Sequence, residues 1–574
     1  MVSLLDTVAQ RLQPAFDALE PGADPILRLS EHADAQVNGV LGLAKRLGRP
    51  PREVAEEIVA RSDLAGLCEQ IEIAGPGFLN LTFSAAFLGR HLEALAADGH
   101  LGVRQSDADG TVVVDYGAPN VAKEMHVGHL RSAIIGDALA RLLDYSGSRV
   151  IRENHIGDWG TPFGMLIEHS LDIGEAEAAR EIALGDLNAF YQEARKAFDG
   201  DPEFAERSRR RVVLLQSGDP ETMRLWARLV EDSIRYFSVV FSRLGVLLTP
   251  DDVRGESAYN DLLPGVVEAL ADKGLLVESE GALCVFPPGF SNREGEALPV
   301  IVRKSDGGYN YAATDLACIR DRTDRLGADL ILYVVGAPQS QHFEMVFAVA
   351  AMAGWLDEER RAVHVAFGSV LGEDRKMFRT RSGESTKLID LLDEAVERAL
   401  AVVREKNPAL DEAAASAVAE AIGIGAVKYA DLSTERTRDY VFDWDRMLAF
   451  EGNTAPYLQY AHARICSIFR RAAAEGAPPR AFGRPQEAAE RALVLCLSAF
   501  GDAVASAIAA YGPHRLCTYL YELAGTFTSF YEHCPVLRAG EEATVARRLG
   551  LCELTRRVLA QGLELLGIAA PEQM

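Results

Sequence analysis

Cysteine is scarce and irregularly placed in this 574-residue sequence. The chain has eight cysteines, and no two of them are spaced as C-x-x-C: Cys68, Cys284, Cys318, Cys466, Cys496, Cys517, Cys534 and Cys552. Disulfide frameworks and structural zinc sites need recurrent, closely spaced cysteines. We therefore expect neither a disulfide scaffold nor a protein-bound zinc or other metal ion.

A basic leader and long apolar runs are also missing. The first residues, MVSLLDTVAQRLQ, place no positively charged stretch before an apolar one, so they do not resemble a secretory signal. No apolar run approaches the roughly 20 residues needed to cross a bilayer. These absences predict a cytoplasmic protein with no membrane partner.

Positive charge is in deficit, with 59 Lys and Arg against 84 Asp and Glu and a formal net charge of −25. Long-range repulsion disfavours indiscriminate binding to nucleic acid or anionic membranes, although a local basic face can still bind a specific RNA. A composition of 48% hydrophobic and 25% charged residues is typical of folded proteins rather than disordered or fibrous ones. At about 150 residues per domain, the length suggests roughly four domains.

Residues 1–107 are predicted to form a small α/β N-terminal domain. Apolar residues recur at helical spacing from Leu5 to Leu19, and residues 71–83 (IEIAGPGFLNLTF) read as two short strands around a Gly-Pro-Gly turn. A Gly-, Asp- and Ser-containing stretch at 98–110 then marks a boundary.

Residues 108–395 are predicted to form a doubly wound α/β domain of the Rossmann type. A β-branched run at 111–116 suits a strand buried on both faces, and a helix-periodic run at 130–143 ends at Gly147. A second strand from Val150 completes a βαβ unit. Residues 330–337 and 363–372 resume the sheet as two strands with a helical pattern after each, so residues 171–299, helical and then turn-rich, are an insertion.

The remainder of the chain is Ala- and Leu-rich and helix-periodic from Thr386, a plausible N-cap. Breaks fall near Pro408, Pro456, residues 478–485 and Gly512. We predict a connecting helical segment at 396–450 and an α-helical bundle domain at 451–574.

The most informative segment is APNVAKEMHVGHL, residues 118–130, between a buried strand and a helix. A helix N-terminus presents free backbone N–H groups and the positive end of the helix dipole, which suits phosphate. His126 and His129 add two donors there, and Gly128 lets a ring or a phosphate approach the backbone. The segment predicts a nucleotide site.

HVGH resembles the HIGH signature of class I aminoacyl-tRNA synthetases, in the form that it takes in arginyl-tRNA synthetases. Four further segments are similar to that family's signatures: residues 155–166 (HIGDWGTPFGML), 309–317 (YNYAATDLA), 427–433 (VKYADLS) and 442–464 (FDWDRMLAFEGNTAPYLQYAHAR). The GPGFLNL stretch resembles the family's N-terminal domain. The resemblance covers nearly the whole chain.

A second class I signature, KMSKS, is a mobile loop whose lysine stabilises charge on the ATP phosphates. At the corresponding place this chain reads EDRKMFRTRSGES, residues 373–385, where Lys376, Arg379, Arg381 and Gly383 are the candidates for a phosphate clamp and the register stays open. In the resembling family a lysine upstream of HIGH is thought to compensate, and Lys123 occupies that position.

A pocket for a guanidinium needs a carboxylate and neutral acceptors around a planar, permanently charged group. Tyr311 and Asp315, four apart in a segment that turns helical, share one face, and Gln339 follows a strand end, with Gln341 as a rival. By resemblance these side chains hold the arginine side chain. By the same resemblance Asp115, Asn120 and His155 face its amino and carboxylate groups.

The densest basic run, ERSRRRV at 206–212, is either a charged helix face or a contact with an RNA acceptor arm. By resemblance the terminal bundle binds the anticodon stem and loop, and the N-terminal domain contacts tRNA. Aromatic residues of the bundle cannot be assigned to bases from sequence, because most such residues serve packing.

The resemblance implies a class I ligase that makes arginyl-adenylate from arginine and ATP with Mg²⁺ and then esterifies the 3′-terminal adenosine of tRNA(Arg). We expect a monomer. The rivals are another class I synthetase such as a glutamyl or cysteinyl enzyme, a HIGH-type nucleotidyltransferase that needs no RNA, and a non-enzymatic RNA-binding scaffold. A cysteinyl enzyme would need a thiolate-rich zinc site that this cysteine spacing does not offer.

Overall fold

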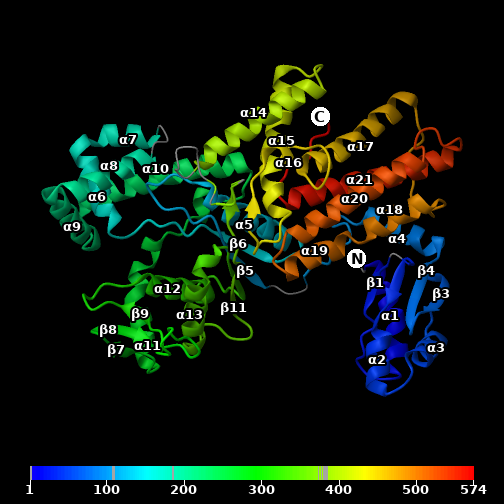
Figure 1. Cartoon of the computed structure of the whole chain (residues 1–574), viewed down its shortest axis with the longest axis horizontal. Helices are drawn as coiled ribbons and strands as arrows, with labels where there is room; N and C mark the ends of the chain where they lie inside the picture. Colours follow the sequence, from blue (N-terminus) through cyan, green and yellow to red (C-terminus); the bar gives the residue numbers. More distant parts are fainter. Residues whose placement is uncertain are drawn as a thin grey trace.

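The structure, a computed structural model, describes residues 3–30, 32–106, 110–183, 187–372, 374–376, 378 and 386–574, with the backbone alone for residues 181–183, 187 and 188. The N-terminal domain lies at the lower right of Figure 1. Its four-stranded sheet has the order β1-β2-β4-β3, and the strands flanking the Gly-Pro-Gly turn pair antiparallel, as predicted. The elements are α1 Leu4–Asp17, β1 Leu27–Leu29, β2 Ala35–Val37, α2 Gly39–Leu47, α3 Pro51–Arg61, β3 Cys68–Ala74, β4 Phe78–Phe83 and α4 Ala85–Ala97.

A parallel four-stranded sheet of order β11-β10-β5-β6 forms the centre of the molecule. All five residues of β5 are buried, which explains why this strand is an unbroken β-branched run. Helix α5 follows it and ends before Gly147, whose φ of 88° suits a glycine after a helix end. The elements are β5 Thr111–Asp115, α5 Val127–Tyr145, β6 Arg149–Glu153, β10 Leu330–Tyr333 and β11 Arg361–His364.

Between β6 and β10 the chain first makes a set of helices: α6 Pro162–Ile173, α7 Glu175–Ala183, α8 Leu187–Gly200, α9 Pro202–Gln216 and α10 Pro220–Leu244. The basic run lies on α9. Arg211 donates to Glu168 at 2.7 Å and Arg207 donates to Asp172 at 2.7 Å, so these two arginines join α9 to α6. The charged-face interpretation therefore holds for these two residues.

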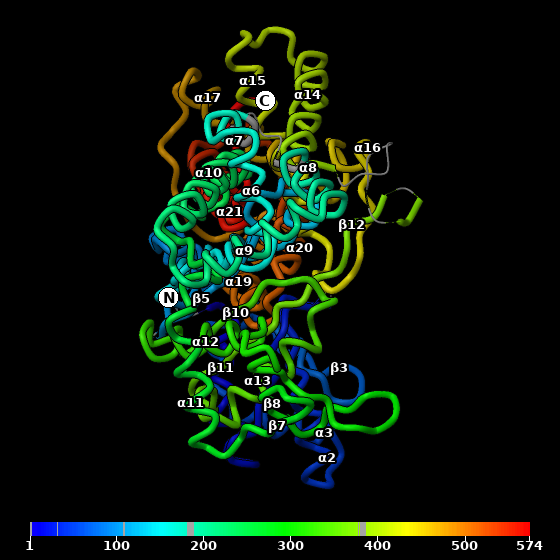
Figure 2. Tube along the Cα trace, turned by 90° about the vertical axis from the view of Figure 1, so that its left-hand side faces the viewer, coloured from blue at the N-terminus to red at the C-terminus, as the bar shows by residue number. Residues whose placement is uncertain are grey.

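The second half of the insertion, which the sequence suggested was only turn-rich chain, contains regular elements, and these continue beyond residue 299 as β9 and α12. Its antiparallel sheet β7-β8-β9 and two helices share a hydrophobic core with residues of the central strands, Val113 of β5 and Ile331 of β10 among them. The elements are η1 Pro250–Asp252, η2 Glu256–Leu262, α11 Leu263–Asp272, β7 Val277–Ser279, β8 Ala282–Val285, β9 Val300–Arg303 and α12 Tyr311–Asp324. Figure 2 shows this lobe below helices α6–α10. Its strands are only three or four residues long, which left too little periodicity to detect.

After β10 the chain forms η3 Ala337–Gln339 and α13 Ser340–Met352, as the helical pattern predicted. The expected strand at 363–372 is wrong as a single element. Its first residues end β11, and β12 Val370–Leu371 instead pairs in parallel with β13 Tyr440–Val441. The chain leaves the central sheet there because β12 takes a partner from beyond α15, and no helix follows β11 directly.

Helices dominate the rest of the described chain: α14 Leu388–Lys406, α15 Glu412–Leu432, α16 Trp444–Met447, α17 Ala455–Glu475, α18 Ala488–Ser498, α19 Phe500–Ala509, α20 His514–His533 and α21 Glu542–Leu565. Lys387, not Thr386, is the N-cap of α14, and it makes no side-chain cap bond. Helices α14 and α15 lie against each other at the top of Figure 2. The bundle α17–α21 lies between the central sheet and the N-terminal domain in Figure 1.

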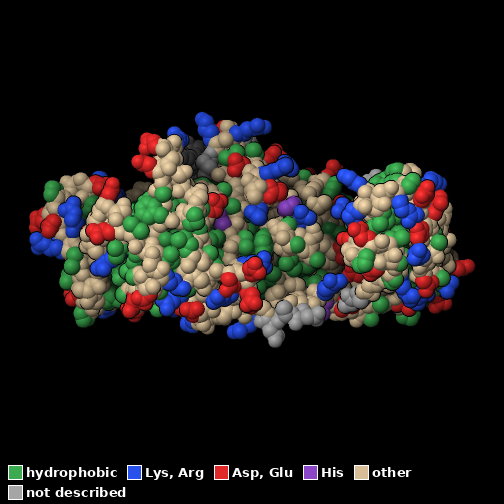
Figure 3. Space-filling view, turned by 90° about the horizontal axis from the view of Figure 1, so that it is seen from below, with side chains coloured by type: hydrophobic (Ala, Val, Ile, Leu, Met, Phe, Trp, Pro, Cys, Tyr) green, Lys and Arg blue, Asp and Glu red, His purple; other side chains and the backbone are tan. Residues whose placement is uncertain are grey.

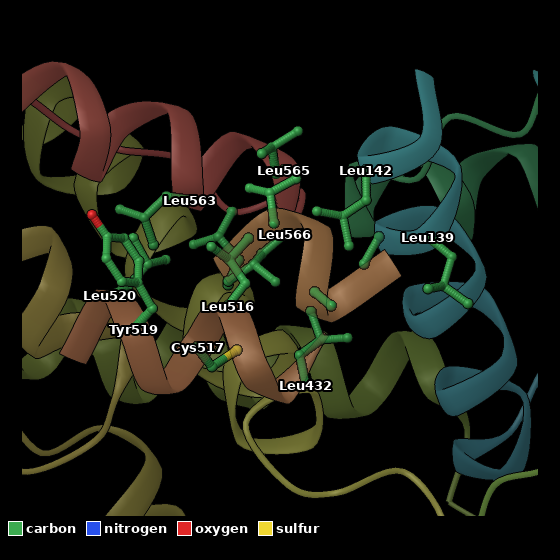
Figure 4. Packing of buried hydrophobic residues seen from close by; sticks show 14 of the residues in the cluster. Leu139, Leu142, Leu432, Leu516, Cys517, Tyr519, Leu520, Leu563, Leu565 and Leu566 are labelled. Atoms are coloured by element: carbon green, nitrogen blue, oxygen red, sulfur yellow. The ribbon is translucent and has the colours of Figure 1, made fainter. Parts of the chain in front are cut away.

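Helix α5 packs directly on the terminal bundle. In Figure 4, Leu142 of α5 points toward Leu566 after α21, with Leu516 of α20 and Leu432 of α15 beyond, and Leu139 of α5 belongs to the same cluster. All five side chains are at most 2% exposed. The helix that begins at HVGH is therefore part of the same hydrophobic core as the bundle.

One apolar stretch contradicts the expectation from hydropathy. Residues Ala488–Ala509 have the length and mean hydropathy, 1.9, of a membrane span. In the structure they form two helices, α18 and α19, that meet at Ala499, and Leu493 and Val504 are buried in the bundle core.

Seen from below, Lys and Arg are intermixed with Asp and Glu, and neither sign forms a continuous patch on that face (Figure 3).

Candidate active site

HVGH lies where the order of the central sheet reverses. The chain passes from β5 to β6 on one side of β5 and returns on the other side as β10, and open α/β sheets bind ligands at such a point. His126 is the N-cap of α5. Ser132 of α5 fixes the helix there, because its hydroxyl accepts from the Gly117 N–H at 2.9 Å and donates to the Val334 carbonyl at 2.7 Å.

Backbone hydrogen bonds fix the tautomer of both histidines. His126 Nδ1 accepts from the Gly128 N–H at 3.0 Å, and His129 Nδ1 accepts from the His126 N–H at 3.1 Å. Burial, with help from the Lys123 charge, lowers the pKa of His126, and burial followed by His126 lowers the pKa of His129 to about 3. Both rings are therefore neutral at pH 7, and each carries its proton on Nε2, where it can be donated.

Lys123 is exposed at the end of this segment. Its ammonium nitrogen lies 4.6 Å from the ring centroid of Tyr191 on α8, a cation–π contact. The insertion therefore contacts the lysine whose charge acts on both histidines.

A cavity of about 230 Å³ opens beside the histidines. It is lined by His126, Val127, Gly128, Arg131, Gly336, Pro338, Phe367, Gly368, Ser369, Val370, Phe378 and Thr386. Both β5 and β10 contribute the chain that follows them, so the cavity lies at the carboxyl ends of the central strands. Of its glycines, Gly128 and Gly368 donate their backbone N–H groups to His126 Nδ1 and the Arg436 carbonyl.

Two described residues of the region around the basic loop line this cavity. Phe378 lines it and hydrogen-bonds to Val370, and Thr386 lines it and accepts from the Val127 N–H at 3.3 Å. Lys376 is exposed. The other predicted members of the clamp, Arg379, Arg381 and Gly383, lie outside the described residues.

Arg131, two residues after HVGH, connects the cavity to α15. Its side chain is 1% exposed and forms an ion pair with fully buried Asp431 at 3.0 Å. It also donates to the Arg438 carbonyl at 3.0 Å and lies over the Tyr440 ring at 5.4 Å. Burial raises the pKa of Asp431, because it disfavours the ionised carboxylate, whereas the charge and hydrogen bond of Arg131 lower it. The ionised state of Asp431 therefore depends on the Arg131 guanidinium.

Tyr311 and Asp315 lie on adjacent turns of α12, as predicted, and α13 faces them. His342 of α13 places Nε2 at 2.6 Å from Asp315 Oδ2, and its ring centroid is 4.8 Å from that of Tyr311. Gln339 and Gln341 are both exposed at the start of α13, and the geometry does not choose between them.

A second carboxylate, Glu256 of η2, belongs to the same neighbourhood. Burial raises the pKa of Glu256 to about 7, and among its electrostatic neighbours His155 lowers the pKa while Asp158 and Asp315 raise it. His155 Nδ1 lies 3.1 Å from the Arg254 carbonyl, which fixes the ring at this edge. The structure thus brings Glu256, Asp158 and Asp315 near one another, with His155 beside them.

Asp115 is paired within the protein. Its Oδ2 accepts from the Arg322 guanidinium at 2.7 Å, and Glu153 of the neighbouring strand accepts from the same guanidinium at 2.6 Å. Arg322 is fully buried and lies over the Tyr333 ring at 5.0 Å. One guanidinium therefore bridges the ends of β5 and β6.

The chain between β5 and α5 is strained and tightly packed. Ala118 and Ala122 have φ values of 43° and 57°, which cost about 1–3 kcal/mol for residues other than glycine. Asn120 packs its side chain against Gly157 so closely that a Cβ there would lie 2.3 Å from Asn120 Oδ1. Gly157, the first glycine of HIGDWG, is thus required by this contact.

Three family models match the chain. They describe the catalytic domain of class I (R) tRNA synthetases at residues 91–444, a DALR anticodon-binding domain at 458–574, and an arginyl-tRNA synthetase N-terminal domain at 3–83. The chain belongs to the class I arginyl-tRNA synthetases. The resemblance carried by HVGH and the longer signatures is confirmed.

Relatives and solved structures agree with this family. An arginine–tRNA ligase of Thermobifida fusca is 53% identical over 99% of this chain and 98% of its own length. One of Streptomyces avermitilis is 50% identical over the full length of both. Crystal structures of arginyl-tRNA synthetases from Plasmodium falciparum (29% identity, TM-score 0.84) and Thermus thermophilus (26%, 0.80) each match over 100% of both chains.

The synthetase fold also shows what the sequence could not. His342, Glu256, Arg322 and Arg131 were not singled out from sequence, although Arg131 follows His129 by two residues and His342 follows Gln339 by three. Among the residues that the structure describes, no cluster of three or more His, Cys, Asp or Glu side chains is arranged to hold a metal ion.

Proposed function

We propose that this arginyl-tRNA synthetase uses the HVGH cavity to join arginine to ATP as arginyl-adenylate and then transfers the arginine to the 3′-terminal adenosine of tRNA(Arg). Aminoacylation of tRNA is the activity of the family to which the chain belongs. The observation that carries the proposal is the pair of neutral histidines at the N-terminus of α5, beside a cavity bordered by a basic loop.

The phosphates of ATP, carried in with Mg²⁺, belong at the histidine end of the site. His126 and His129 each offer an Nε2–H, the α5 N-terminus adds the positive end of its dipole, and Lys123 adds a charge. Neutral donors fixed by their own backbone need no reorganisation as phosphate charge develops. Gly128 lets the His126 ring lie against the backbone, because a Cβ there would lie 2.7 Å from His126 Cε1, and so helps to fix the imidazole that we propose binds ATP.

Lys376, Arg379, Arg381 and Gly383 are proposed to complete the phosphate clamp. The support is the position of the loop ends, because Phe378 and Thr386 line the same cavity as His126. A loop anchored on both sides of a nucleotide cavity can carry its cations to the leaving pyrophosphate.

The guanidinium of arginine is proposed to lie between α12, α13 and η2. Asp315 and Glu256 supply negative charge, Tyr311 supplies a hydroxyl, and Gln339 or Gln341 a neutral acceptor. A permanently charged guanidinium that leaves water needs such carboxylates, since an unpaired buried charge is strongly unfavourable.

The amino and carboxylate groups of arginine are proposed to lie toward Asn120, His155 and Asp115. Arg322 donates to Asp115 Oδ2, and the Asp115 carboxylate keeps further acceptor capacity for the substrate amino group. Asn120 is exposed and His155 is partly exposed at the ends of β5 and β6.

The reaction then needs no side-chain nucleophile. The arginine carboxylate attacks the α-phosphorus in line, forming a new P–O bond as pyrophosphate leaves. In the second step a hydroxyl of the terminal adenosine attacks the activated carbonyl and AMP leaves. The protein contributes position and charge stabilisation.

The RNA partner is proposed to contact the terminal bundle with its anticodon arm and the N-terminal domain with another part. The matching DALR anticodon-binding model supports the first contact. We further propose that the protein acts in the cytoplasm as a monomer, which sedimentation of the full-length chain tests.

The decisive experiment is ATP–pyrophosphate exchange with each amino acid, with and without tRNA(Arg). We expect arginine to be the one amino acid that supports exchange. The exchange should be negligible without tRNA and restored by tRNA that cannot be charged. Exchange with another amino acid would overturn the substrate, and robust exchange without tRNA would overturn the requirement for RNA. Absence of exchange under every condition would favour the RNA-binding scaffold.

A further inference from the structure

His342 contacts both side chains that the proposed function assigns to the guanidinium. Its Nε2 lies 2.6 Å from Asp315 Oδ2, and its ring centroid lies 4.8 Å from that of Tyr311. Tyr311 and Asp315 come from the first turns of α12, and His342 comes from the first turn of α13. The three side chains therefore form one group across two helices.

The contact with Asp315 is a directed hydrogen bond. An ionised carboxylate only accepts, so the imidazole Nε2 donates, and 2.6 Å is the separation of a charge-assisted bond. The His342 and Asp315 side chains are 20% and 18% exposed, which limits competition from water. The bond occupies Oδ2, fixes the carboxylate plane and leaves Oδ1 for a ligand.

The contact with Tyr311 acts on a side chain that has little other support. Tyr311 is 64% exposed, so its ring is free on most of its surface. The imidazole packs against it at an interplanar angle of 53°. His342 thus restricts the phenol as well as the carboxylate.

We propose that His342 is a positioning residue for the arginine side chain, holding Asp315 and Tyr311 in the orientation that a planar guanidinium requires. The inference rests on the proposed function, which places the guanidinium at these two residues. His342 itself touches neither the histidines of HVGH nor the cavity beside them, so it acts on arginine and not on ATP.

Orientation matters more for arginine than for lysine. A guanidinium is planar and its donors point in fixed directions, whereas an ammonium is a compact charge that accepts carboxylates from many directions. Loss of His342 should therefore lower the affinity for arginine by a larger factor than the affinity for lysine, which is weak already. A structural role for His342 would not change this ratio.

The test is calorimetric titration of arginine, lysine and ATP into the full-length protein with tRNA(Arg) present. His342→Ala removes the ring and the donor, His342→Phe keeps a ring without the donor, and His342→Gln keeps a donor. Glu344→Gln, an exposed position on the same helix, is the matched control.

We expect His342→Ala and His342→Phe to weaken arginine binding by about 10-fold to 100-fold, the effect of losing a hydrogen bond to a charged group. His342→Gln should recover most of the affinity, and ATP affinity should stay within about 2-fold in every variant, as for a site remote from the substitution. Equal losses of arginine and ATP affinity, or normal arginine binding by His342→Phe, would overturn the proposal.

A double-mutant cycle separates this proposal from the proposed guanidinium site on which it rests. In an Asp315→Asn background, His342→Phe should add less than about 3-fold, because the carboxylate that it positions is gone. Additive losses would show that His342 acts elsewhere. If Asp315→Asn alone leaves arginine binding unchanged, the assignment of the guanidinium site fails instead.

Discussion

Arginine binding should depend on pH through Glu256. Burial raises the pKa of Glu256 to about 7, so in the empty protein this carboxyl is largely protonated below neutral pH. A bound guanidinium stabilises the ionised form. Arginine therefore binds with release of a proton at low pH, and its affinity should rise as the pH rises through about 7.

The magnitude follows from the pKa. For one group with a pKa of about 7, the apparent dissociation constant scales as one plus ten to the power of pKa minus pH. Between pH 8 and pH 5.5 that factor changes by about 30-fold, or roughly 2 kcal/mol. At pH 6, binding should release close to one proton per arginine, since most of the free protein is then protonated at this carboxyl.

The assay is calorimetric titration of arginine from pH 5.5 to pH 8 in two buffers of different ionisation enthalpy, which reports affinity and protons together. Glu256→Gln is the control, and it should bind arginine with a flatter profile because it removes the carboxyl that titrates. An unchanged slope in Glu256→Gln, or an affinity independent of pH in the wild type, would refute the assignment.

The same shift affects the free protein in the opposite sense. A carboxyl whose pKa is higher in the folded than in the unfolded state stabilises the fold while it is protonated. That contribution is present below the unfolded value of about 4.5 and is lost as the pH rises through about 7. Arginine should consequently raise the melting temperature more at pH 8 than at pH 5.5.

Three further predictions test the site and its support. His126→Ala or His129→Ala should slow adenylate formation by roughly 10²-fold with arginine affinity little changed, and equal losses of both would contradict a role at the phosphates. Asp431→Ala strands the buried Arg131 charge and should lower the free energy of unfolding in urea by about 3–5 kcal/mol, with recovery when Arg131→Met is added. Arg322→Met leaves two buried carboxylates unpaired and should cost at least as much, so a loss below about 1 kcal/mol would show that the bridge is unimportant.

The parts of the site that sequence reasoning located are those set by neighbours along the chain. The run at 111–116, the periodicity of α5 and the glycine after it identified a strand, a helix and the loop between them, and the structure confirms all three. His126 and His129 follow from that local order, because their hydrogen bonds are to backbone within three residues.

Other expectations failed where tertiary pairing overrode local pattern. The expectation that no apolar stretch is long enough to span a membrane missed residues Ala488–Ala509, which the structure folds into two core helices, α18 and α19. The short strands β7, β8 and β9 gave no periodic signal, and β12 was assigned to the wrong partner because parallel pairing with β13 joins segments far apart in sequence.

By itself, the sequence determined the order of strands and helices around HVGH, the helical character of the C-terminal region and, through long signatures, the family. Only the tertiary structure decided which charges meet: Arg131 pairs with Asp431 300 residues away, and Arg322 with Asp115 207 residues away. It also gave His342 its contact with Asp315 and gave Glu256 its raised pKa. The physical reason is that backbone hydrogen bonds and amphipathic periodicity act over a few residues, whereas ion pairing and desolvation depend on distances in space that only the folded chain creates.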